Sequence, residues 1–151
     1  MRTRRFLTAL LVLTACGGDG FLASTRFAFD LRAARARWES AGVDSYEMTV
    51  RRLCECTLGW EPVRVTVDDG EVVSRIVLSS GDPVPGSLAQ YYPDVPGLFA
   101  IIEQAFADGA DGLRFEFHPS YGFPAAIAID WVRDLVDDEV TYRAEDFASL
   151  P

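Results

Sequence analysis

A short stretch in the middle of the chain constrains the fold most, because it has the pattern of a β-hairpin. Residues 63–67 alternate between valines and polar side chains, and Asp69-Gly70 follows directly. Alternation with a period of two is typical of a strand with one buried face. An Asp-Gly pair readily adopts the two positive φ angles of a type I′ turn. We therefore predict an antiparallel hairpin whose second strand runs over residues 71–78.

Similar alternation recurs along the chain, beside two segments with helical periodicity. Apolar side chains repeat every three to four positions over residues 31–41, where Asp30 is the predicted N-cap, and over 96–107. Further strands are predicted at 46–56, 113–118, 123–129 and 140–142. A sheet with one apolar face needs helices to cover it. The predicted fold class is α+β, with an antiparallel sheet of about six strands in a repeated helix-plus-three-strand order and two helices covering one face.

The N-terminus has the features of a lipoprotein signal peptide. Arginines precede an apolar run, residues 6–13, that is too short to span a bilayer. Leu13-Thr14-Ala15-Cys16 resembles the lipobox of bacterial lipoproteins, which implies cleavage after residue 15 and a lipid on Cys16. The alternative is a secreted protein in which Cys16 occurs by chance. We predict a signal peptide at 1–15, a lipidated cysteine with a flexible tether at 16–29, and a single α+β domain at 30–151.

The charge of the chain excludes some partners and favours a location. Loss of residues 1–15, which hold three of the 14 basic residues, leaves 11 basic and 23 acidic residues, a net charge of −12. Such a surface repels the phosphates of nucleic acids and of anionic lipids, so we expect no nucleic-acid partner. We expect the protein to be attached to the membrane by its N-terminal lipid.

The predicted signal peptide implies a location in the cell envelope, with the domain facing away from the cytoplasm. Gly17 and Gly18 stand where an aspartate would resemble an inner-membrane retention signal, which slightly favours an outer membrane where there are two.

The Cys54-Glu55-Cys56 run is the most conspicuous motif for site chemistry. A structural zinc site needs four ligands, and the chain has one histidine, His118, so no metal and no cofactor are predicted. On a flat strand, the Cα atoms of residues i and i+2 lie about 6.6 Å apart. That separation is near the upper limit for a disulfide. We predict a Cys54–Cys56 disulfide only where the strand bends, for which Leu58-Gly59 could provide the bend.

The polar face of the predicted sheet is the candidate binding face. Arg51, Arg64, Arg114, Glu116 and His118 are expected to lie there. The same face is predicted to hold Glu47, Thr49, Thr66, Arg75, Thr141 and Arg143. Arginine suits interfaces because its planar guanidinium forms paired hydrogen bonds with carboxylates. The alternative is a solvated face with ion pairs inside the sheet.

Several further residues support a family resemblance. They are Trp38, Tyr46, residues 52–56, 63–65 with 69–70, 121–124, 127–130 and 137–139. Together they resemble a family of bacterial lipoproteins catalogued as domain of unknown function 6174, over roughly residues 31–147. That family brings no established activity.

No set of residues in the sequence amounts to a catalytic site. Ser79-Ser80-Gly81 lacks the strand-to-helix turn that holds a nucleophilic serine. We therefore expect a non-catalytic envelope module that binds a protein or another envelope ligand. The alternative is a metal- or redox-active protein that uses Cys54 and Cys56, with His118 as a further candidate.

Overall fold

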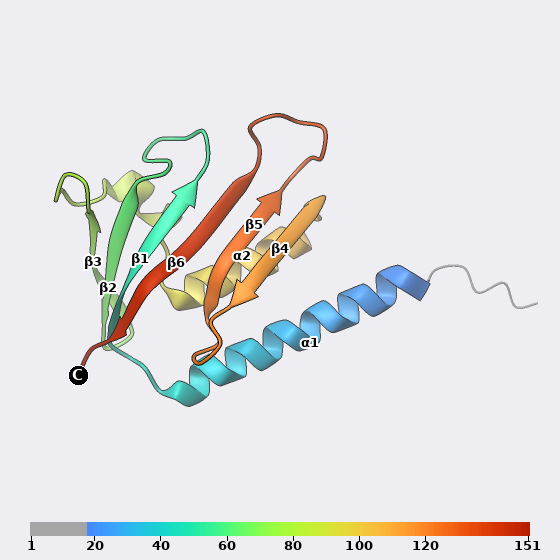
Figure 1. Ribbon diagram of the computed structural model, residues 1–151, viewed down its shortest axis with the longest axis horizontal. Coiled ribbons are helices and arrows are strands. Elements are labelled where there is room, and N and C mark those ends of the chain that lie inside the picture. The colour runs from blue at the N-terminus through green and yellow to red at the C-terminus, as the bar shows by residue number, and fades with distance from the viewer. Residues whose placement is uncertain (1–17) are drawn as a thin grey trace, which may run out of the picture.

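The computed structural model describes residues 18–151, so residues 1–15 and Cys16 lie outside it. Six strands form one sheet in the order β3-β2-β1-β6-β5-β4, and all neighbours are antiparallel (Figure 1). The strands are β1 (Tyr46–Leu53), β2 (Pro62–Asp68), β3 (Glu71–Val77), β4 (Gly112–Phe117), β5 (Pro124–Asp130) and β6 (Val140–Ser149). Each set of three consecutive strands forms a meander, and pairing of β1 with β6 joins the two meanders.

The helices are α1 (Gly18–Ala41), α2 (Val95–Ala107) and the short 3₁₀ helix η1 (Gly86–Tyr91). Helices α1 and α2 contact the same face of the sheet: Phe27 of α1 packs edge-on against Phe115 of β4, and Phe99 of α2 stacks with Phe117. The predicted α+β class, with its repeated helix-plus-three-strand order, is confirmed.

The predicted hairpin is present between β2 and β3. Asp69 and Gly70 both have positive φ angles, 48° and 77°, and Asp68 pairs with Glu71 across the turn. An irregularity between Thr66 and Val67 shifts the register of this pair of strands. Because alternation reverses at such a bulge, it changes which residues of β3 face the helices.

Helix α1 is longer than the sequence predicts. It begins at Gly18, so the prediction of a helix start at Asp30 is wrong, and the described part of the predicted tether is helical. Phe27 gives a physical reason, because its ring stacks on Phe106 of α2 at 4.3 Å between centroids. Burial of this aromatic side chain offsets the cost of ordering further turns. The first turns of α1 extend beyond the edge of the sheet (Figure 1).

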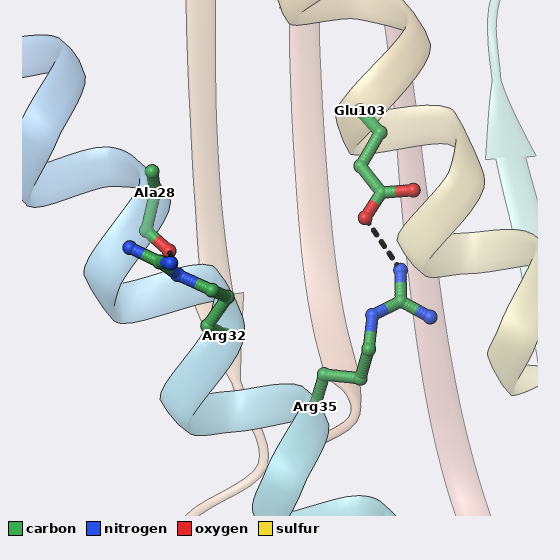
Figure 2. Close-up of polar contacts among 4 residues, drawn as sticks. All are labelled: Ala28, Arg32, Arg35 and Glu103. Carbon is green, nitrogen blue, oxygen red and sulfur yellow. Dashed lines mark hydrogen bonds and ion pairs between the residues drawn. The ribbon is translucent and has the colours of Figure 1, made fainter.

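A polar contact also joins the two long helices. Figure 2 shows Arg35 of α1 extended towards Glu103 of α2, with Nη2 and Oε1 2.6 Å apart. The Arg35 guanidinium also lies over the ring of Phe99, 4.6 Å from its centroid. Arg32, one turn earlier, instead donates back to the carbonyl of Ala28 within its own helix. Arg35 therefore fixes α1 against α2, whereas Arg32 faces solvent.

The core lies between the sheet and the helices. Val50, Val65 and Ile127 from the strands and Leu98 and Ile102 from α2 are completely buried. Helix α2 begins with a side-chain cap, because the Asp94 carboxylate accepts a hydrogen bond from the Gly97 amide at 2.8 Å. Such a cap satisfies an amide that the helix itself leaves unpaired.

Candidate functional site

Most of the predicted binding residues lie on the sheet face that the described helices leave uncovered. Arg51 in β1 pairs with Arg143 in β6, which in turn pairs with Ala126 in β5. Ala126 lies opposite Glu116 in β4. Residues opposite one another in a sheet point to the same face. One row across four strands therefore carries two arginines, a small residue and a glutamate.

The neighbouring rows add two further arginines. Arg64 in β2 pairs with Thr49, and Thr49 pairs with Glu145. On the other side, Arg114 in β4 pairs with Ala128. We call the four arginines of this surface the arginine face: Arg51, Arg64, Arg114 and Arg143. Four of the 11 basic residues downstream of position 15 thus meet on one face of an acidic protein.

A shallow groove runs along β5 within the arginine face. Ala126 and Ala128 form its floor, because their side chains are much shorter than those of the flanking strands. Arg114 and Glu116 form one wall, and Thr141 and Arg143 form the other, around a volume of about 480 Å³. A second hollow of about 290 Å³ continues past Arg114 and Thr141 to Asp130 and Glu139. The groove therefore runs from a cationic half to an acidic end.

One of the four arginines is neutralised within the sheet. Arg51 Nε lies 3.1 Å from Glu145 Oε2, and both side chains are about 40% exposed (38% and 42%). Arg64, Arg114 and Arg143 form no ion pair within the part of the chain that the structure describes. All three are exposed. They are consequently available to carboxylates of a partner.

Two residues predicted for this face lie elsewhere. Arg75 faces the helices and donates a hydrogen bond to the Tyr92 carbonyl at 2.6 Å. The bulge between β2 and β3 is the reason, since it pairs Arg75 with the buried Val65. His118 follows β4 in a turn, where its Nδ1 accepts from the amides of Ser120 and Tyr121.

The His118 ring also stacks on the buried Phe123, with centroids 4.7 Å apart. A bulge between Glu116 and Phe117 ends the regular alternation just before it. His118 therefore stabilises a turn and does not line the groove.

The cysteine pair lies at the end of the sheet opposite to His118. Strand β1 ends at Leu53, not at residue 56, and a disulfide joins Cys54 to Cys56 with Cα atoms 5.3 Å apart. The chain turns here, because the Cys56 amide donates to the Cys54 carbonyl at 2.9 Å. Gly59 is required in this turn, since a Cβ there would lie 2.2 Å from the Cys54 carbonyl oxygen.

The cysteines and His118 do not form a common site. Strands β1 and β4 run in opposite directions, so the end of β1 and the end of β4 lie at opposite ends of the sheet (Figure 1). Across residues 18–151, no group of three or more side chains of His, Cys, Asp or Glu could hold a metal ion. Within residues 18–151, the redox alternative is left with the cysteine pair without His118.

The alternation of residues in the sequence predicts the arginines of this face but not the groove between them. The signal was present in β5, where Ala126 and Ala128 alternate with Ile127 and Ile129. Small residues on the outer face of an inner strand leave a depression when the flanking strands carry long side chains. The strand order was needed to recognise it, because β5 lies between β4 and β6.

Comparison with known proteins gives a family without an assigned activity. Residues 30–149 match the family of unknown function DUF6174, and the chain belongs to this family. No curated protein and no solved structure matches the chain. Among the described residues, none of the helices is both long and apolar enough to cross a membrane.

Proposed function

We propose that the chain is a lipid-anchored, non-catalytic binding protein of the cell envelope, and that its arginine face binds an acidic surface of an envelope protein. The observation that carries the proposal is the gathering of Arg51, Arg64, Arg114 and Arg143 on the uncovered sheet face. Three of these guanidiniums have no carboxylate partner among the described residues. Their planar geometry matches carboxylates of a partner.

The anchor in this proposal is the lipid on Cys16. The basic start, the short apolar run and the Leu13–Cys16 motif support cleavage before the cysteine and acylation of its sulfur. Such an anchor places the domain outside the cytoplasm. The outer membrane is the slightly favoured site in a host with two membranes. Cell-envelope conditions also allow a disulfide between Cys54 and Cys56.

The anchor is tested on protein purified from the membranes of its native host. We expect mass spectrometry of the N-terminal peptide to show a cleaved chain that begins with an acylated Cys16. A Cys16→Ala variant is the control, and it should accumulate with its signal peptide attached. An unmodified Cys16 on a soluble, processed protein would contradict the lipoprotein assignment.

The arginine face is tested by removing three of its charges together. The variant combines Arg51→Ser, Arg64→Ser and Arg114→Ser, and partners are captured by crosslinking in intact cells and quantified against the unchanged protein. We expect the captured partners to be lost, with at most a slight fall in thermal stability from loss of the exposed Arg51–Glu145 pair. A matched control removes three exposed arginines outside this face: Arg32→Ser, Arg37→Ser and Arg133→Ser.

The two variants separate a binding face from a general charge effect. Equal loss of partners in both variants would mean that overall charge, not this face, governs capture. Full retention in the arginine-face variant would place the binding site elsewhere. Binding through this face should also weaken as salt is added, because exposed charges are screened over about 8–10 Å at physiological ionic strength.

A further inference from the structure

A small pocket lies on the covered side of the sheet, between the strands and α2. Arg52 of β1, Tyr91 of η1 and Tyr142 of β6 line it, together with Trp131, which follows β5. Ile101 and Gln104 of α2 complete the lining that matters here. Its volume is about 230 Å³. That is below the range of about 300–1,000 Å³ typical of pockets for drug-sized ligands, so only a small ligand fits.

Arg52 has an unusual environment within this pocket. Its guanidinium carbon lies 4.1 Å from the centroid of the Tyr91 ring, which places the charge over an aromatic face. Its Nε is buried and has no hydrogen-bond partner among the described residues. The ion pairs of residues 26–151 do not include Arg52 either. A buried donor without a partner is destabilising, since such groups in native proteins normally form a hydrogen bond to the protein or to an ordered water.

The backbone around Arg52 is held in place by the turn that contains the disulfide, residues 54–60. The Trp60 amide donates to the Arg52 carbonyl at 2.9 Å. The Tyr92 hydroxyl donates to the Leu58 carbonyl at 2.6 Å, which ties the same turn to the segment before α2. These two bonds hold the Arg52 backbone and the turn beside it, and the Tyr91 ring lies against the Arg52 guanidinium at the pocket.

The remaining walls favour a flat, apolar body beside an anionic group. Ile129, Trp131 and Ile101 contribute apolar surface from β5, its following residue and α2. Burial raises the pKa of Tyr142, although the nearby Arg52 acts in the opposite direction. The Tyr142 hydroxyl consequently stays protonated at neutral pH and keeps its proton for donation. A guanidinium and a hydroxyl side by side can both donate to one carboxylate.

We propose that the Arg52 pocket binds a small monocarboxylate whose other end is an aromatic or short apolar group. The carboxylate accepts hydrogen bonds from the Arg52 guanidinium, and the apolar end packs against Trp131. This site is separate from the arginine face, and the proposal depends on neither the lipid anchor nor the envelope partner. The two arginines side by side in β1 thus serve different ligands on opposite faces of one sheet.

Phenylacetate is a suitable probe, because it combines a carboxylate with a flat ring. Its binding to the full chain can be measured by calorimetry and by the fluorescence of Trp131, with Trp131→Phe to assign the optical signal. We expect saturable binding at millimolar or lower concentration. We expect Arg52→Gln to weaken it at least about tenfold, which corresponds to about 1.4 kcal/mol. The matched control is Arg51→Gln, which changes the neighbouring residue on the other face and should leave the affinity unchanged.

A second measurement keeps the test decisive if Arg52→Gln does not fold. Phenylacetamide has the same shape as phenylacetate and no charge, so the unchanged protein should bind it at least about tenfold more weakly. Equal affinity for the amide and the acid would overturn the proposal. So would absence of saturable phenylacetate binding at about 10 mM, or equal weakening by Arg51→Gln and Arg52→Gln.

Discussion

Arg51 and Arg52 are neighbours in the sequence, yet they occupy very different surroundings. Arg51 lies on the uncovered face, where Glu145 neutralises it and water reaches both side chains. Arg52 points to the covered side, over the Tyr91 ring, with its Nε buried and without a partner in the described chain. A strand sends successive side chains to opposite faces, so one dipeptide contributes to two surfaces.

This difference shows what each face contributes to the molecule. Exposed ion pairs add little to stability, since water and salt screen them. Burial of apolar side chains from the strands and from α2 supplies most of the stabilisation, and it occurs on the covered face alone. The uncovered face is therefore free to change its charges, whereas substitutions on the covered face act on folding.

The largest effect should follow from Trp38→Ala. Trp38 of α1 is 9% exposed and packs edge-on against Tyr46, Phe123 and Phe147. Its removal leaves a cavity, so we expect the free energy of unfolding in urea to fall by about 3–5 kcal/mol. The control is Trp60→Ala, since Trp60 is 61% exposed and should change stability by no more than about 0.5 kcal/mol. Similar losses in both variants would contradict the division.

The sequence predicts features that neighbouring residues determine, and it does not predict features that depend on contacts between distant segments. The hairpin was predictable because Asp69-Gly70 fixes its own turn. The face of the sheet on which Arg75 lies was not predictable, because it depends on a bulge in the pairing of β2 with β3. The start of α1 was missed because Phe27 gains its contacts from α2, far away in the sequence.

The same distinction separates the two candidate sites. Alternation alone correctly grouped Arg51, Arg64 and Arg114 on one face, since each lies in a regular stretch of strand. The pocket at Arg52 brings together residues from β1, η1, α2 and β6. No local sequence pattern predicts that these residues lie together, because the pocket forms only when the helices pack against the sheet.

Alkaline pH should act on the covered face next. Burial raises the pKa values of Tyr46, Tyr92 and Tyr142 above their usual value of 10.0. The folded state therefore favours the protonated phenols, and this contribution is complete below pH 10 and is lost as the pH rises towards the folded-state values. We expect the free energy of unfolding to fall steadily above about pH 10, with a smaller fall in Tyr46→Phe. A constant free energy up to about pH 11 would contradict this prediction.

Removing the disulfide should have an intermediate effect that is confined to one end of the sheet. The Cys54–Cys56 bond closes a very short loop, so its loss in the Cys54→Ser, Cys56→Ser double variant should cost about 1–2 kcal/mol. Because this turn holds the Arg52 backbone, phenylacetate binding should weaken, while partner capture by the arginine face is retained. In the unchanged protein, denatured but not reduced, thiol titration should find neither Cys54 nor Cys56 free. Two free thiols would rule out the bond.

Replacing each neighbouring arginine by methionine should give effects of opposite sign. Arg52→Met removes a buried donor without a partner and places the terminal methyl group at about the position of Nε. We expect the free energy of unfolding without ligand to rise by up to about 1 kcal/mol, because the desolvation cost exceeds the stacking on Tyr91. Arg51→Met should lower it slightly. A clear loss of stability in Arg52→Met would show that Arg52 serves the fold and not a ligand.

The smallest effect should come from the ion pair of the uncovered face. Arg51 and Glu145 are 3.1 Å apart, but both are more than a third exposed, so water competes for each charge. A double-mutant cycle with Arg51→Gln and Glu145→Gln should give a coupling energy below about 1 kcal/mol that declines as salt is added. The cycle cancels effects that each substitution has alone, so it isolates the pair.

The result would also bear on the binding face. Weak coupling means that Arg51 can exchange Glu145 for a carboxylate of a partner at little cost. A coupling of several kcal/mol that persists in salt would instead make this pair part of the folded framework. The face would then retain only Arg64, Arg114 and Arg143 as arginines available for binding.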